Sequence, residues 1–165
     1  MNKSLIPRLK KIKMLATDVD GVLTDSGMYY SENGDELKKF NTRDGMGLVL
    51  LRNAGFIVAI VTSEDTKIVE RRAAKLKITD LLQGIRDKVA ALEILMKRHN
   101  LKWEEVAYIG DDVNDLDVMR HVGFAAAPAD ATEQNKKLAH YVTKRKGGDG
   151  CVREICDIVL GLSKS

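Results

Sequence analysis

Short runs of apolar and β-branched residues alternate along the chain with longer segments in which apolar residues recur at helical spacing. Such runs predict strands, and the clearer ones lie at residues 14–17, 57–61, 106–109 and 124–127, with weaker ones at residues 81–82 and 141–143. Strands that alternate with helices are typical of βαβ units, in which neighbouring strands run parallel. The pattern therefore predicts an α/β fold with a doubly wound, Rossmann-like parallel sheet.

The helical segments between these strands are bounded by residues that commonly cap helices. Asp65 and Asp87 precede two of them, and Gly55 and Gly123 follow two others. The predicted helices span residues 46–53, 66–76, 88–99, 116–121 and 152–160. The chain has no internal repeat or linker, and its 165 residues are predicted to form a single domain over residues 1–165.

One segment, residues 27–40, interrupts the alternation of strands and helices. Two short stretches, residues 28–30 and 37–40, flank a polar stretch that contains Asn33-Gly34, a strong signal for a hairpin turn. A hairpin here directly follows the first strand and could act as a small flap over the carboxyl ends of the strands, where open α/β sheets bind ligands. The pattern alone fits an ordinary edge hairpin equally well.

Composition and charge limit the classes of protein to consider. The chain has 44% apolar and 31% charged residues and a formal net charge of +3. No uninterrupted apolar run approaches the length of roughly 18 residues that a membrane span needs. The basic stretch at residues 8–13 could contact nucleic acid, but a solvated lead-in to the first strand is the simpler interpretation because aromatic residues are few. We therefore expect no membrane and no nucleic-acid partner.

The start of the chain and the two cysteines bear on the expected location. No apolar core of a signal peptide follows residues 1–4, so nothing there predicts export. Cys151 and Cys156 have neither the spacing of a CxxC motif nor that of a zinc site. We expect reduced thiols and a cytoplasmic location.

Asp18 and Asp20 stand where the first predicted strand ends, just before Gly21. Side chains two positions apart on a strand point the same way, so both carboxylates can face one pocket. A carboxylate attacks a phosphorus centre when a cation offsets the charge between them, and a second carboxyl group can protonate the leaving alcohol. The pair is a candidate nucleophile and metal site, although two solvated aspartates on a surface turn have the same pattern.

Two further polar features lie where a later strand ends and a helix begins. Thr62 and Ser63 follow the strand at residues 57–61 and offer hydroxyl and backbone N–H groups to an anion. Lys88 opens a helix, where a lysine opposes the helix dipole unless it serves an anion. Each feature alone is more often a helix cap or a solvent-facing side chain.

The stretch at residues 110–115, Gly-Asp-Asp-Val-Asn-Asp, places Asp111, Asp112 and Asp115 after the strand at residues 106–109. Carboxylates this close repel one another unless a cation or basic groups offset their charge. Hard oxygen ligands of this kind suit Mg²⁺. The sequence therefore predicts a magnesium site at this edge of the sheet.

Taken in order, these features are strand-Asp-x-Asp, strand-Thr, a lysine at a helix start, and strand-Gly-Asp-Asp-x-x-Asp. The chain thereby resembles the haloacid dehalogenase superfamily of phosphohydrolases. The short length, the hairpin in place of a large cap domain, and the stretches at residues 41–45, 83–88 and 147–154 look specifically like the capless phosphatases of 3-deoxy-D-manno-octulosonate 8-phosphate (KDO 8-phosphate) and of nonulosonate 9-phosphates. The resemblance spans residues 12–162 and implies the haloacid dehalogenase fold.

The resemblance implies a role for each of the motif residues. Asp18 is the nucleophile that forms an aspartyl-phosphate, and Asp20 is the general acid that later serves as the base. Thr62 binds the transferring phosphoryl group, with Ser63 beside it, and Lys88 neutralises its charge and orients Asp18. The implied enzyme is a phosphoric monoester hydrolase.

The resemblance also implies a Mg²⁺ cofactor. Its ligands are the Asp18 carboxylate, the Asp20 backbone carbonyl, the Asp111 carboxylate and water molecules. Asp112 and Asp115 lie behind these ligands and support them.

The implied substrate is a small sugar phosphate, the phosphate monoester of a 2-keto-3-deoxy sugar acid. Both KDO 8-phosphate and nonulosonate 9-phosphates of the KDN or N-acylneuraminate type fit this description. The octulosonate branch usually has Thr-Gly-Arg where this chain has Thr62-Ser63-Glu64. Glu64 followed by Lys75 looks more like the nine-carbon branch, where such a pair can meet the longer polyol or its amide. A glutamate and a lysine on a helix surface have the same pattern.

The family is typically homotetrameric, which implies that the hairpin packs between protomers. It also implies that the loop with Gly147 and Gly148 reaches the substrate in a neighbouring site, although a flexible loop before the last helix is the alternative. Similar domains occur as non-catalytic assembly domains with acylneuraminate cytidylyltransferases, but retention of Asp18, Asp20 and Lys88 favours an enzyme. A phosphatase of another small sugar phosphate stays open.

Overall fold

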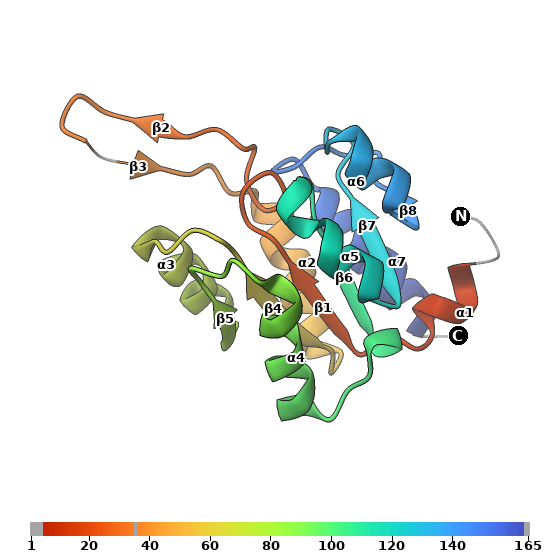
Figure 1. The fold of residues 1–165 in the computed structure, drawn as a ribbon. Helices are drawn as coiled ribbons and strands as arrows, with labels where there is room; N and C mark the ends of the chain where they lie inside the picture. Colours follow the sequence, from red (N-terminus) through yellow and green to blue (C-terminus); the bar gives the residue numbers. More distant parts are fainter. Residues whose placement is uncertain (1–4, 35, 164–165) are drawn as a thin grey trace.

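The computed structural model describes residues 5–34 and 36–163. Its main element is a six-stranded sheet with the order β5-β4-β1-β6-β7-β8, in which every neighbouring pair is parallel (Figure 1). The strands are β1 (Met14–Thr17), β4 (Ile57–Val61), β5 (Asp80–Leu82), β6 (Val106–Ile109), β7 (Phe124–Ala127) and β8 (Tyr141–Val142). This architecture confirms the predicted α/β fold with a parallel sheet.

Helices cover both faces of the sheet (Figure 1). They are α1 (Ile6–Leu9), α2 (Thr42–Asn53), α3 (Lys67–Leu76), α4 (Lys88–His99), α5 (Leu116–His121), α6 (Glu133–Leu138) and α7 (Cys151–Ser163), with 3₁₀ turns at Trp103–Glu105 and Val113–Asp115. Buried side chains of α1, α2, α3 and α7 form one apolar cluster with the sheet. Those of α4 and α5 form a second cluster on the other face, where α6 packs beside α5. The sheet is therefore doubly wound.

β1 lies at the centre of this arrangement. All of its residues are buried, and it pairs with β4 on one side and β6 on the other. A strand buried on both faces needs no polar residues at alternate positions, which explains the nearly continuous apolar run in the sequence. The chain passes from β1 to β4 and β5 on one side and then returns to β6 on the other. Ligands of open α/β sheets bind at such a switch in strand order.

The predicted boundaries hold for the four clearer strands, while β5 begins one residue earlier and β8 ends one residue earlier than predicted. Helix α2 begins four residues before its predicted start, because Asn41 caps it by accepting a hydrogen bond from the Arg43 backbone N–H. Thr66, rather than Asp65, caps α3. Helix α7 extends beyond both predicted ends, and no sequence pattern predicted the short helices α1 and α6.

The predicted hairpin is present as β2 (Tyr29–Tyr30) and β3 (Glu36–Leu37), an antiparallel pair that projects from the rest of the chain (Figure 1). Its strands are shorter than predicted, and a hydrogen bond of 3.0 Å from the Gly34 N–H to the Ser31 carbonyl closes its turn. Asp35 and the chain start at residues 1–4 lie outside the described residues. The described part of the chain holds no large cap domain, and none of its helices is long and apolar enough to cross a membrane.

Candidate active site

A pocket opens at the carboxyl ends of β1, β4 and β6. Asp18 directly follows β1, Thr62 directly follows β4, and Asp111 lies shortly after β6. The pocket has a volume of about 260 Å³ and is lined by Asp18, Asp20, Ser26, Thr62, Ser63, Glu64, Asp111, Asp112, Val113 and Asn114. The structure therefore brings together most of the residues that the sequence motifs predict.

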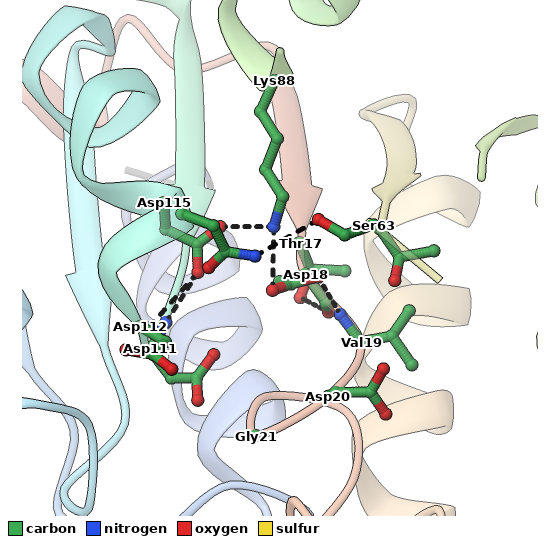
Figure 2. Close-up of polar contacts among 12 residues, drawn as sticks. Thr17, Asp18, Val19, Asp20, Gly21, Ser63, Lys88, Asp111, Asp112 and Asp115 are labelled. Carbon is green, nitrogen blue, oxygen red and sulfur yellow. Dashed lines mark hydrogen bonds and ion pairs between the residues drawn. The ribbon is translucent and has the colours of Figure 1, made fainter. Parts of the chain in front are cut away.

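Asp18 is held in place through both of its carboxylate oxygens. Its Oδ1 accepts a hydrogen bond of 2.7 Å from the Val19 N–H, and its Oδ2 lies 2.8 Å from the Lys88 Nζ (Figure 2). The side chain is almost completely buried. Burial, reinforced by the charge of Asp115 and opposed by Lys88, raises the pKa of Asp18 to about 7. Each oxygen keeps a free lone pair, so the carboxylate can still bind a cation or attack an electrophile.

Lys88 is the first residue of α4, behind the helix cap Asp87, and its side chain is buried. Its Nζ lies 2.8 Å from Asp18 Oδ2 and 2.6 Å from Asp115 Oδ1, so one ammonium group bridges two carboxylates (Figure 2). Burial by itself lowers the pKa of Lys88, but the two carboxylates outweigh it and raise the pKa. The predicted lysine thus serves an anionic site instead of facing solvent.

Asp115 is more central than its predicted supporting position. It is fully buried, and its Oδ1 accepts hydrogen bonds from Lys88 and, at 2.7 Å, from the Tyr108 hydroxyl. Its Oδ2 accepts a hydrogen bond of 3.0 Å from the Asp111 N–H. Sequence reasoning missed Tyr108, for which the only signal was one hydroxyl inside an otherwise apolar strand. Asp115 therefore ties α4, β6 and the loop after β6 together.

Asp111 has an oxygen that lacks a partner. Its Oδ1 is buried and receives no hydrogen bond within the described part of the chain. Burial, with the charges of Asp18 and Asp115, raises the pKa of Asp111 to about 8. Oxygens of Asp18, Asp111 and Asp115 all lie within 4.8 Å of one another. Three carboxylates with a single lysine among them, one oxygen unpaired, are a donor set that suits a hard divalent cation.

Asp112 and Asp20 lie at the rim of this cluster. The Oδ1 of Asp112 accepts a hydrogen bond of 2.7 Å from the neighbouring Val113 N–H, so that carboxylate caps its own turn. The Asp20 carboxylate points away from Lys88 (Figure 2), and its Oδ1 lies 2.6 Å from the Nζ of Lys38. Sequence reasoning missed Lys38, because no motif marks a lysine at the base of the hairpin.

Thr62, Ser63 and Glu64 follow β4 along the wall of the pocket. Thr62 is buried, and its hydroxyl accepts a hydrogen bond from the Glu64 N–H at 3.3 Å. The Ser63 hydroxyl accepts one from Asn114 at 3.2 Å. Glu64 lines the pocket, but Lys75 is exposed near the far end of α3 and does not. Within one chain, the predicted Glu64–Lys75 pair is not brought together.

Gly147 and Gly148 are buried against the loop that carries Asp20, rather than lining the pocket. A Cβ on Gly147 would lie 2.0 Å from the backbone oxygen of Gly21. Gly148 donates a hydrogen bond of 3.0 Å from its N–H to the Val22 carbonyl. In this chain the two glycines pack against the loop that carries Asp20, because only residues without side chains fit there.

The fold and the site define a class of protein, and comparison with known proteins identifies it. A model of the haloacid dehalogenase-like hydrolases matches residues 57–155. The 3-deoxy-D-manno-octulosonate 8-phosphate phosphatase of Yersinia pestis is 46% identical over 94% of this chain and 83% of its own length. The Escherichia coli K12 enzyme of the same name is 43% identical over 97% of this chain and 85% of its own length.

Solved structures agree with the sequence comparison. The crystal structure of the Yersinia pestis phosphatase matches with a TM-score of 0.96 and 44% identity, covering 98% of this chain and 88% of that one. The phosphatase of Moraxella catarrhalis, solved with a magnesium ion, a phosphate ion and KDO, matches with a TM-score of 0.96 and 38% identity, covering 99% and 94%.

This chain therefore belongs to the haloacid dehalogenase-like hydrolases, within the family of these octulosonate phosphate phosphatases. The predicted resemblance, the predicted fold and the prediction of a phosphoric monoester hydrolase are confirmed.

Replacing Gly147 by alanine should destabilise the protein. The added Cβ collides with the Gly21 backbone, and the resulting shift should cost about 1–3 kcal/mol in the free energy of unfolding. Urea unfolding measures this loss. Gly161→Ala, in α7 with open space around the new Cβ, is the control and should not destabilise. Equal stability of the two variants would contradict the close packing of Gly147.

Mg²⁺ should raise the melting temperature of the protein in proportion to the logarithm of its concentration, since a bound ion stabilises the native state. Asp111→Asn should abolish most of this rise, because it removes a charged ligand from the cluster. Without Mg²⁺, the same variant should be no less stable than wild type, because it relieves repulsion among buried carboxylates. Asp117→Asn, on the exposed face of α5, should keep the full rise. A rise that survives in Asp111→Asn would place the ion elsewhere.

Proposed function

We propose that this protein is a Mg²⁺-dependent phosphatase that hydrolyses the phosphate monoester of KDO 8-phosphate through an aspartyl-phosphate on Asp18. The observation that carries the proposal is the buried contact of 2.8 Å between Asp18 and Lys88 at the floor of an acidic pocket. The names of the curated relatives, which share 42–46% identity with this chain, support the choice of substrate.

The residues present fit a magnesium ion. The carboxylates of Asp18 and Asp111 and the backbone carbonyl of Asp20 would hold it, and the buried Oδ1 of Asp111, which accepts no hydrogen bond from the described residues, is the observation that most favours a cation ligand here. A bound Mg²⁺ would neutralise charge on the phosphoryl oxygens and so let an anionic carboxylate approach an anionic ester. The Oδ1 of Asp115 already accepts hydrogen bonds from Lys88 and Tyr108, so the role of Asp115 is to position the lysine.

In the first half of the reaction, a carboxylate oxygen of Asp18 attacks the phosphorus, and the bond between phosphorus and the sugar oxygen breaks. The Asp20 carboxyl group donates its proton to that oxygen, so that the sugar leaves as a neutral alcohol. Lys88 and the hydroxyl of Thr62 offset the charge on the transferring phosphoryl group. The product is Asp18 carrying the phosphoryl group, with Asp20 ionised.

In the second half, the Asp20 carboxylate accepts a proton from a water molecule as the water oxygen attacks the phosphorus. The bond between phosphorus and the Asp18 oxygen breaks, inorganic phosphate leaves, and Asp18 is again a carboxylate. Asp20 ends protonated and ready for the next ester. Each residue is thus returned to its starting state, as a catalytic cycle requires.

Asp18→Asn should abolish turnover, because the amide keeps the shape but is not a nucleophile. Asp20→Asn should lower kcat by about 10²- to 10⁴-fold through loss of proton transfer. With a substrate that has a very good leaving group, such as p-nitrophenyl phosphate, Asp20→Asn should cost much less for phosphoryl transfer to Asp18. Burst kinetics with both substrates measures this step. Retained turnover in Asp18→Asn would exclude the covalent route.

A nine-carbon 9-phosphate is a second candidate substrate, favoured by one observation. Glu64 lines the pocket at the position where the octulosonate branch usually has arginine. An acidic group there can accept hydrogen bonds from a longer polyol or an amide. Lys75 could take part only from a second subunit, since it lies away from the pocket of its own chain. The homotetramer and the cytoplasmic location stay predictions. Two alternative functions also stay open, a non-catalytic assembly domain and a phosphatase of another small sugar phosphate.

Phosphate release from KDO 8-phosphate should exceed that from nine-carbon 9-phosphates and from common sugar phosphates when kcat/KM values are compared. Glu64→Arg should shift the ratio further toward the eight-carbon substrate, since a hydrogen bond lost at a binding site changes discrimination by about 1–3 kcal/mol. Lys75→Ala is the matched control and changes the ratio only if a neighbouring subunit supplies Lys75. A preference of wild type for the nine-carbon substrate would overturn the choice of substrate and leave the reaction class intact.

A further inference from the structure

The lysine at the base of the hairpin is unusually buried. The side chain of Lys38 has no solvent exposure, and its Nζ lies 2.6 Å from the Oδ1 of Asp20. A buried ammonium group is stable only where an anion compensates its charge. Asp20 is the nearer of two carboxyl groups, and Glu36, at 3.6 Å from the Nζ, leaves the ammonium group an anionic partner when Asp20 carries a proton.

The neighbouring lysine makes a contrasting contact. Lys39 is mostly exposed, and its Nζ lies 3.4 Å from Asp25 Oδ2, which also accepts a hydrogen bond of 2.6 Å from the Tyr29 hydroxyl. Successive side chains of an extended segment point to opposite sides, so Lys38 reaches Asp20 while Lys39 faces outward. The hairpin is therefore joined to the loop after β1 by two ion pairs, of which only the Lys38 pair contacts a reacting residue.

In the described part of the chain, the side-chain contacts of Asp20 are made by one carboxylate oxygen. Within the described residues, Lys38 and the Thr24 hydroxyl, at 3.5 Å, both contact Oδ1. The Asp20 side chain lines the pocket and is 29% exposed. With Oδ1 held by these contacts, Oδ2 is the oxygen available to exchange a proton with the leaving group or with water.

We propose that Lys38 is a positioning residue for Asp20, which makes the hairpin a part of the catalytic machinery. Lys38 fixes the orientation of the Asp20 carboxylate, so that the free oxygen meets the leaving alcohol. The proposal rests on the proposed function, in which Asp20 is the general acid and base. The competing role for Lys38 is direct binding of an anionic group of the substrate.

The test is Lys38→Met, which keeps an unbranched side chain only one atom shorter and removes its charge. Lys39→Met is the matched control, since it cuts the other ion pair of the hairpin without touching Asp20. With KDO 8-phosphate, Lys38→Met should lower kcat by about 10- to 100-fold, a part of the full general acid contribution. In the burst phase with p-nitrophenyl phosphate the loss should be under about 3-fold, because that leaving group needs no proton.

A double variant separates positioning from an independent role. If Lys38 acts through Asp20, adding Lys38→Met to Asp20→Asn should change kcat by less than about 2-fold, because coupled residues are not additive. A crystal structure of Lys38→Met should have the Asp20 side chain in more than one rotamer. Lys38→Gln keeps a hydrogen-bond donor and should fall between wild type and Lys38→Met. It also serves as the test if the methionine variant unfolds.

Three outcomes would overturn the inference while leaving the proposed function intact. The first is a rise in KM with kcat unchanged, which is the mark of direct substrate binding. The second is equal losses in the Lys38 and Lys39 variants, which is the mark of a purely structural hairpin. The third is full additivity with Asp20→Asn. A wild-type protein inactive toward every phosphate ester would instead overturn the proposed function, and this inference with it.

Discussion

The contact on which the rest of the site depends is the buried ammonium group of Lys88 between Asp18 and Asp115. Removing ions from water costs several kcal/mol for each, and only close, well-oriented partners offset that cost. One lysine faces the carboxylates of Asp18, Asp111 and Asp115, so the cluster keeps an excess of negative charge. Burial raises the pKa of Asp18 and of Asp111, and the neighbouring negative charges raise both pKa values further. The same excess of negative charge favours binding of a further cation in the pocket. The fold therefore places together a set of carboxylates that a bound Mg²⁺ would stabilise.

The topology delivers these charges to one point from distant parts of the sequence. β1 is central and buried, so the residue that follows it emerges in the middle of the sheet edge. α4 begins with Lys88 on the same edge, and the 3₁₀ turn after β6 supplies Asp115. Tyr108 donates to Asp115 from within the sheet, which couples the charged cluster to the apolar core behind it. The positions of the charged side chains therefore depend on how the core packs at this edge of the sheet, and a change in either alters the other.

Sequence reasoning succeeds where a single local rule decides the outcome. The strands around the site are buried on both faces, so their apolar runs define their ends, and residues placed directly after those ends fall in the pocket. It fails where the outcome depends on packing between remote segments. Nothing in the sequence near Lys38 reveals that its amine meets Asp20, and Gly147 looks like a flexible loop residue although it packs against Gly21. Helices α1 and α6 are too short for their apolar spacing to be recognised.

Asp18 and Asp20 are two positions apart in the sequence, yet their surroundings differ in kind. Asp18 is 4% exposed and is held by the N–H of buried Val19, directly after β1, and by Lys88 of α4, which do not move without disturbing the core. The Asp20 side chain is 29% exposed and is held by a lysine from a hairpin that projects from the body of the protein. In the proposed mechanism Asp18 is a nucleophile, which benefits from rigid placement, whereas Asp20 serves first as acid and then as base and must meet two partners in turn. The division of support between core and hairpin matches the different roles that we propose for the two aspartates.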